Sequence, residues 1–270
     1  MRKCLYTLVM VTIMLFIPLT GVAASSSSEV LSDAAIQFPD PNFEAAVREL
    51  IGKPKGDITA NDVAKLTSLS LGMLDIADLS GIEYFTALEV LDCGENLLTK
   101  LDLSQNAKLK KLACNKNYLK TLDVSHNPAL IELICWENQL TTLDVSHNPE
   151  LERLTCDTNQ LTALDVSHNS ALIWLYCDGN LLTMLDVSLN PELNVLSCDD
   201  NQLTMLDVSH NPALTRLLCE GNQLTTLNVS HNPALESLFC RNNLFPDKSA
   251  IIGLDENRLV YFSFDPQGSQ

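Results

Sequence analysis

Apolar side chains recur along this chain with a strict period of 21 residues, seven times over residues 88–234. Within one unit, Leu133 and Cys135 alternate with Glu132 and Ile134. This alternation with a period of two is typical of a β-strand that buries one face. A fixed repeat of this length is typical of stacked identical units, each contacting only its neighbours. The pattern therefore predicts a solenoid whose short strands form a parallel sheet, spaced about 4.8 Å apart.

The rest of each unit predicts a far wall without helices. In the same unit, Leu140, Leu143 and Val145 supply the remaining apolar positions, and Asn148-Pro149 turns the chain toward the next unit. Only about ten residues remain for this wall, and they include Thr, Asp, Val and Pro. Such a segment is too short and too rich in poor helix formers to be a helix.

One asparagine follows each strand, and we expect its amide to lie inside the coil. The eight residues are Asn96, Asn117, Asn138, Asn159, Asn180, Asn201, Asn222 and Asn243. An amide offers two donors and an acceptor to backbone groups that the bend leaves over. Because an unpaired buried amide costs about 1–3 kcal/mol, this row is predicted to be structural.

The pattern L-x-x-L-x-(L/C)-x-x-N-x-L resembles the leucine-rich repeat family across residues 66–243. That range holds one 22-residue unit, seven 21-residue units and one partial unit. The resemblance implies a mainly β (α/β) solenoid, a right-handed superhelix with one parallel sheet on its concave side. We expect each fully buried leucine to contribute roughly 1.5–3 kcal/mol to stability.

The ends of a solenoid expose core, so caps are expected on both sides of the repeats. In the N-terminal segment, residues 36–65, helical spacing relates Phe43, Val47, Leu50 and Ile51. Thr59 and Asp62 predict a second short helix that reaches Leu66. The string FPDPNFEAAVRELIGKPKGDITANDVAKL resembles the helical cap of internalin-type bacterial surface proteins, and LSGIEYFTAL in the next unit is similar to the internalin repeat. Residues 244–270 are predicted to be the C-terminal cap, with a strand over residues 259–264.

The first 24 residues have the features of a secretory signal peptide. Arg2 and Lys3 precede an apolar run over residues 4–19, and small residues precede a cleavage point after Ala24. An uncleaved membrane anchor is the alternative, but a span needs about 20 apolar residues. Residues 25–35 are predicted to be a flexible polar lead-in. We therefore expect a secreted, extracellular protein without a membrane span after cleavage, either released or associated with the cell surface.

The net charge excludes one class of partner. The chain carries 17 basic and 34 acidic residues, a formal charge of −17. Removing the signal segment takes away two basic residues and no acidic ones, which leaves −19. Phosphate backbones would be repelled by this charge, so no nucleic-acid partner is expected.

The cysteines form a third regular row, predicted to be a ladder of buried free thiols. After Cys4 these are Cys93, Cys114, Cys135, Cys156, Cys177, Cys198, Cys219 and Cys240. On neighbouring parallel strands their β-carbons would be about 4.8 Å apart, rather than the roughly 3.8 Å that a disulfide prefers. Buried thiols of this kind behave as small apolar groups. A metal-binding thiolate row is the alternative, but it lacks a tetrahedral arrangement. No cofactor is predicted.

Positions that the repeat does not need point outward from the sheet and vary between units. The candidate ligand-binding residues there are Ile134, Trp136, Arg153, Asp157, Trp174, Tyr176, Asp178, Asp199, Arg216, Leu218, Glu220 and Phe239. Trp, Tyr and Arg are favoured anchors of binding surfaces, so we expect a protein-binding patch centred on Trp174 and Tyr176. The carboxylates favour a partner with basic residues. Alternatively the aromatic faces hold a sugar ring, or the aromatics are scattered surface residues with Arg153 merely stacked on Trp174.

Two further rows lie on the far wall. The acidic row comprises Asp102, Asp123, Asp144, Asp165, Asp186 and Asp207, followed by Asn228. Like charges about 5 Å apart repel by about 0.8 kcal/mol in water, so backbone hydrogen bonds or bound calcium should stabilise them, and we favour the backbone.

The histidine row comprises His126, His147, His168, His210 and His231, with Leu189 in the same place in one unit. That interruption favours solvated turn residues over a zinc site or pH switch.

Catalysis finds little support in the sequence. It contains no HExxH helix, no Gly-rich phosphate loop and no nucleophile with a matched base. We therefore expect a non-catalytic, monomeric recognition module that binds a protein through its concave sheet; the internalin resemblance implies attachment to a protein on another cell. A glycan-binding protein and a structural, cation-binding surface protein are the alternatives.

Overall fold

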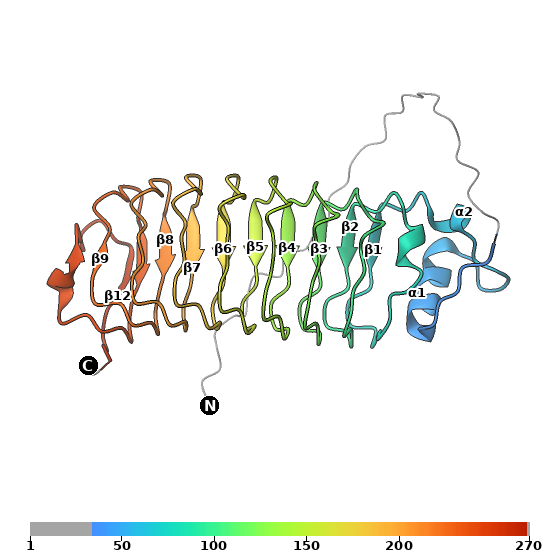
Figure 1. Ribbon diagram of the computed structural model, residues 1–270, viewed down its shortest axis with the longest axis horizontal. Coiled ribbons are helices and arrows are strands. Elements are labelled where there is room, and N and C mark those ends of the chain that lie inside the picture. Colours follow the sequence, from blue (N-terminus) through green and yellow to red (C-terminus); the bar gives the residue numbers. More distant parts are fainter. Residues whose placement is uncertain (1–33, 269–270) are drawn as a thin grey trace, which may run out of the picture. The chain divides into compact units, whose positions relative to one another are not determined.

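The computed structural model describes residues 34–268, so the predicted signal peptide and most of the lead-in lie outside the described residues. Ten parallel strands form one sheet (Figure 1). They are β1 (Ser68–Ser70), β2 (Val90–Asp92), β3 (Lys111–Ala113), β4 (Glu132–Ile134), β5 (Arg153–Thr155), β6 (Trp174–Tyr176), β7 (Val195–Ser197), β8 (Arg216–Leu218), β10 (Ser237–Phe239) and β12 (Tyr261–Ser263). Their order in the sheet is their order in the chain, which confirms the predicted solenoid.

The repeat length sets the register of the sheet. Leu154 lies beside Leu133 on one side and Leu175 on the other, each one repeat away. Because the coils from β2 to β10 have the same length, the middle leucine of each of these strands falls in one column, with its side chain inside the coil. These leucines are at most 1% exposed, as are the cysteines two positions further on.

Two rows of asparagine hold the coils together. Asn159 accepts a hydrogen bond from the Leu140 N–H at 3.0 Å and donates to the carbonyls of Cys135 and Cys156 at 3.1 and 3.0 Å. A second row lies at the opposite corner, where Asn148 donates to the carbonyls of Val124 and Asn127 in the preceding coil at 3.0 and 2.9 Å. This second row was not predicted, since Asn148 was interpreted only as a turn residue. Its strict recurrence was the signal, because a solvated turn position would be free to vary.

The far wall of residues 88–243 contains turns and no helix, as predicted. Asp144 there accepts a hydrogen bond from the Ser146 N–H at 2.9 Å, and the other aspartates of the row repeat this contact. Backbone hydrogen bonding therefore accounts for the acidic row. The five residues of the histidine row are exposed, and the His147 Nδ1 lies 3.1 Å from the Ser146 hydroxyl. One detail was missed: β9 (Leu227–Asn228) pairs with β11 (Ile251–Ile252) in a separate two-stranded sheet.

The N-terminal cap has two helices, α1 (Pro41–Ile51) and α2 (Ala60–Val63). Phe43 is fully buried, and its ring lies 6.2 Å from that of Phe85 in the first coil. The prediction was wrong for Leu50, which is 51% exposed because it lies outside the face that packs on the coil. It was also wrong for the end of the second helix, since α2 stops at Val63 and not at Leu66. A further short 3₁₀ helix, η1 (Ile82–Tyr84), lies in the first coil.

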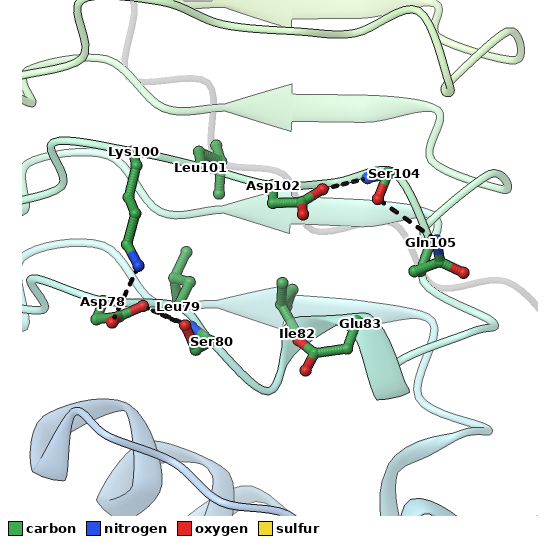
Figure 2. Close-up of a pocket in the computed structure, with 10 residues that line it drawn as sticks. All are labelled: Asp78, Leu79, Ser80, Ile82, Glu83, Lys100, Leu101, Asp102, Ser104 and Gln105. Carbon is green, nitrogen blue, oxygen red and sulfur yellow. Dashed lines mark hydrogen bonds and ion pairs between the residues drawn. The ribbon is translucent and has the colours of Figure 1, made fainter.

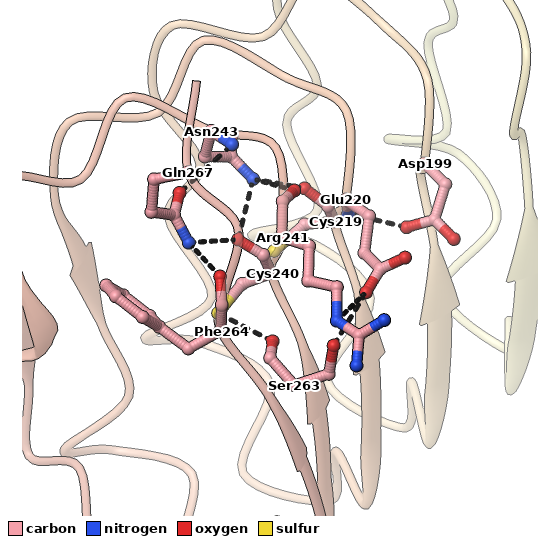
Figure 3. A network of polar contacts seen from close by, with 9 residues as sticks. All are labelled: Asp199, Cys219, Glu220, Cys240, Arg241, Asn243, Ser263, Phe264 and Gln267. Atoms are coloured by element: carbon pink, nitrogen blue, oxygen red, sulfur yellow. Dashed lines mark hydrogen bonds and ion pairs between the residues drawn. The ribbon is translucent and has the colours of Figure 1, made fainter. Parts of the chain in front are cut away.

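At the C-terminal end, β12 covers the last coil by pairing with β10. This strand is shorter than the predicted 259–264, and it is preceded by a 3₁₀ turn, η2 (Lys248–Ala250). Gln267 accepts from the Asn243 N–H and donates to the Cys240 carbonyl, in the network of Figure 3. The last asparagine of the row is thus covered by a side chain from the cap. Among residues 34–268, no helix is long and apolar enough to cross a bilayer.

Candidate interaction surface

The outward face of the ten-stranded sheet, named here the sheet face, carries the candidate residues. On β6, Leu175 points into the core with no exposure, whereas Trp174 and Tyr176 on either side of it are partly exposed. Strand pairing sets Trp174 between Arg153 and Val195. The alternation of the strand therefore places both aromatic rings on the same side of the sheet.

All twelve candidate residues come from β4 to β10 or the positions just after these strands, in three rows. The first row contains Arg153, Trp174 and Arg216; the second contains Ile134, Tyr176, Leu218 and Phe239; the third contains Trp136, Asp157, Asp178, Asp199 and Glu220. Arg216 is exposed, and most of the others are half-buried by neighbouring coils. The exception is Asp178, which is only 8% exposed, so the expectation of an outward carboxylate was wrong for this residue.

Cationic side chains hold the aromatic rings in place. The Arg153 guanidinium lies 4.6 Å from the centre of the Trp174 ring, and its Nε is 3.5 Å from the Glu132 carboxylate. The Lys116 ammonium lies 5.0 Å from the Trp136 ring centre. Arg153 therefore does stack on Trp174, as the less specific interpretation predicted. An aromatic ring that is held in place, yet partly exposed, loses little conformational entropy when a partner covers it.

The third row is a continuous line of carboxylates joined by the backbone. The N–H groups of Asp178, Asp199 and Glu220 each donate to the carboxylate one coil before, at 3.1, 2.8 and 2.6 Å. Asp178 also accepts the Ser197 hydroxyl on both oxygens, at 2.7 and 2.8 Å, which explains its burial. Figure 3 shows the end of the row, where Glu220 lies between Arg241 and Ser263. Ser197 was not among the predicted binding residues, although it occupies the same row as Tyr176, one repeat further along the chain.

Burial makes two of these carboxyls weak acids. Burial raises the pKa of Asp157 from 3.8 to about 7, and the charge of Asp178 adds to this. Burial raises the pKa of Asp199 to about 8, again with a contribution from Asp178. Two carboxyls that hold protons near neutral pH mark a place where the surface can exchange charge with a ligand.

The thiol row behind the sheet face is buried and unpaired. All eight cysteines between Cys93 and Cys240 are free and without exposure. Burial raises the pKa of each thiol, to about 12 for Cys114. The Cys156 thiol lies 3.5 Å from the Tyr176 carbonyl of the next strand. Within residues 34–268 no group of three or more His, Cys, Asp or Glu is arranged to hold a metal ion.

We expect iodoacetamide to label these eight thiols very slowly in the folded protein. Thiolate is the reactive form, and these thiols have both raised pKa values and no access to solvent. Labelling in native buffer and in guanidinium chloride, followed by intact-mass measurement, checks this. The count should rise to eight residues only after unfolding, and rapid native labelling would contradict a buried ladder.

An open hollow of about 420 Å³ lies on the far wall, beside the N-terminal cap (Figure 2). Its polar side chains already pair with one another: Lys100 lies 3.5 Å from Asp78, and Asp78 accepts from Ser80. Asp102 accepts from the Ser104 N–H. The hollow therefore offers a ligand few unpaired groups, and the candidate residues of the sheet face lie elsewhere.

The stacked coils, the asparagine row and the parallel sheet define a leucine-rich repeat solenoid. No protein-family model matches the chain. Internalin J from Listeria monocytogenes serotype 4b (strain F2365) is 44% identical over 70 residues, which are 26% of this chain and 8% of that protein. The solved functional domain of InlJ from Listeria monocytogenes, described as including a cysteine ladder, is 37% identical with a TM-score of 0.63.

That comparison covers 84% of this chain and 60% of the InlJ domain, so this chain spans less than two thirds of it. Internalin C2 from Listeria monocytogenes strain 4b F2365 shares the fold at 21% identity, with a TM-score of 0.64 over 86% of this chain and 94% of that one. This chain therefore has the leucine-rich repeat solenoid fold and is similar to internalins in sequence and structure, as its repeats predicted. Folds of this type commonly act as protein-interaction modules.

Proposed function

We propose that the protein is a non-catalytic extracellular recognition module that binds a protein partner through its sheet face. The observation that carries the proposal is the grouping of Trp174, Tyr176 and Arg153 on adjacent strands of an open sheet. The few residues that carry most of the binding energy in protein interfaces are enriched in Trp, Tyr and Arg. An open sheet suits a large partner, because it offers no deep, dry pocket for a small substrate.

The signal peptide predicted from the sequence and the internalin-like repeats support a location outside the cell. The same resemblance supports contact with a surface protein of another cell. The stacking of Arg153 on Trp174 leaves less of this ring for a flat sugar, so a protein partner fits the site better than a glycan. The partner therefore should be captured by the aromatic pair on β6.

We expect the double substitution Trp174→Ala/Tyr176→Ala to abolish capture of the partner, with at least a tenfold loss for each residue removed. Both side chains are half-buried on the surface, so the free energy of unfolding should change by only about 1 kcal/mol. Capture by immobilised protein from cell-surface proteins and from polysaccharides checks this. Sedimentation or light scattering of the free protein checks the expected monomer.

The matched control is Met184→Ala/Met205→Ala, which removes two side chains that are 76% and 74% exposed on the far wall. This variant should capture the partner as well as the wild type does. Undiminished capture by the Trp174/Tyr176 variant would refute the proposed surface. Capture of a polysaccharide that free sugar displaces would support the glycan alternative in its place.

A further inference from the structure

Charge is divided across the width of the sheet face. The first row contributes three basic side chains, Lys111, Arg153 and Arg216, and one acidic side chain, Glu132, whose carboxylate lies 3.1 and 3.5 Å from Lys111 and Arg153. The middle row is neutral from Ala113 to Phe239 and carries Tyr176. The third row is acidic in four successive coils, at Asp157, Asp178, Asp199 and Glu220. A partner that covers Tyr176 therefore meets carboxylates along one edge.

Two carboxylates of this acidic row have no cationic side chain paired with them in residues 34–268. Within residues 34–268, Asp157 and Asp199 form no ion pair, and each accepts one backbone N–H, from Asp178 and Glu220 respectively. A carboxylate that is mostly buried without a cation costs stability. Neutral residues such as Gly94 or Asn115, which stand at the same position in other repeats, would avoid that cost. A cationic group on a bound partner would replace the missing counter-charge.

We propose that Asp157, Asp199 and Glu220 of the acidic row dock a basic, extended peptide segment of the protein partner, and that docking expels protons from the row. This proposal rests on the proposed function, because the segment lies beside Trp174 and Tyr176 on the same face. Charge complementarity supports it, since the whole chain has a net charge of −17 and the row is its continuous acidic line on the sheet. Arginine suits the row best, because its guanidinium pairs with carboxylates and also stacks on aromatic rings.

The proton step follows from the acidity of the two unpaired carboxyls. With pKa values of about 7 and about 8, Asp157 and Asp199 hold protons near neutral pH. A guanidinium beside a carboxyl favours the ionised form, so binding moves these protons to solvent. Affinity for a basic segment should therefore rise as pH increases through about 6 to 9 and fall as the carboxyls are protonated.

Neighbouring groups that act on these two carboxyls are themselves anionic or neutral. Asp178, the Tyr176 phenol and the thiols of Cys135, Cys156 and Cys177 lie near Asp157. Asp178, Asp200, Glu220 and the thiols of Cys198 and Cys219 surround Asp199. Arg241, the basic group at the end of the row, lies 3.8 Å from Glu220. The pH response is therefore assigned to the carboxyls of the row.

The test uses a fluorescent oligo-arginine peptide and an oligo-glutamate peptide of the same length, titrated with the full protein at about pH 5 and about pH 9. We expect oligo-arginine to bind at least about tenfold more tightly at the higher pH and oligo-glutamate not to bind. The variant Asp157→Asn/Asp199→Asn should bind weakly at both pH values. An amide oxygen still accepts the backbone N–H, so this variant keeps the hydrogen bonds of the row.

The matched control is Asp165→Asn/Asp207→Asn, which makes the same charge change in the same two coils but on the far wall. It should keep the pH-dependent binding of the wild type. Equal binding of both peptides, or unchanged pH dependence in the Asp157/Asp199 variant, would overturn the proposal. If the Trp174/Tyr176 variant loses the natural partner while the Asp157/Asp199 variant captures it equally at both pH values, the proposed function stands and this inference fails.

Discussion

Replacing Asn159 by alanine is expected to lower the free energy of unfolding by about 3 kcal/mol. The Leu140 N–H would lose its acceptor inside the coil. The carbonyls of Cys135 and Cys156 would each lose one of two amide donors and keep the other, from Asn138 and Asn180 respectively. The largest part of the loss is therefore the buried N–H, with smaller contributions from the weakened carbonyls and the missing volume.

Urea unfolding followed by circular dichroism measures this change. The control is Gln160→Ala, which truncates the next side chain, an exposed one, and leaves the bond from the Gln160 N–H to the Leu140 carbonyl intact. That variant should stay within about 0.5 kcal/mol of the wild type. A loss below about 1 kcal/mol for Asn159→Ala would mean that the asparagine row does not carry the stability assigned to it.

The rows inside the coil could be predicted because each one depends on the repeat alone. A strand alternates, so Leu154 and Cys156 had to share the buried face once their period was known. The stacking of equal coils then placed each leucine beside its counterpart, without any knowledge of the partner side chains. The helical cap could be predicted for a similar reason, since Asp40 and Thr59 are local capping residues of α1 and α2.

Contacts between unlike residues of different coils could not be predicted in the same way. The burial of Asp178 depends on a serine at position 197, where other coils have Tyr176 or Leu218. The pairing of β9 with β11 depends on how the C-terminal cap returns to the far wall. These features need the register between particular coils together with the size of each side chain, and a repeat pattern specifies only the register.

The sheet face thus combines a repeated backbone scaffold with side chains that differ between coils. In the acidic row, this combination lowers the stability of the folded state. The scaffold buries Asp157 and Asp199 because neighbouring coils stack against them, whatever residues they carry. Each raised pKa is therefore a penalty on the folded state with the carboxyl ionised. Binding surfaces commonly retain such unfavourable groups.

We expect the free energy of unfolding to fall as pH rises from about 5 to about 9, by on the order of 7 kcal/mol from Asp157 and Asp199 together. Their folded pKa values, about 7 and about 8, lie above the ordinary value of 3.8. In the window between about pH 4 and 8 the folded protein therefore holds protons that the unfolded chain has released. Stability is highest at the acidic end of this window and is lost as the folded carboxyls ionise.

Urea unfolding at several pH values measures this slope, and the Asp157→Asn/Asp199→Asn variant isolates it. This variant should be more stable than the wild type at about pH 9 and should show a flatter slope. Asp165→Asn/Asp207→Asn should keep the wild-type slope, because hydrogen bonds from Ser167 and Ser209 hold the pKa of these two carboxyls below 3.8, outside the window. If the wild type and the Asp157/Asp199 variant lose stability equally between these pH values, the two carboxyls are ionised in the folded protein and the proposed proton release has no source.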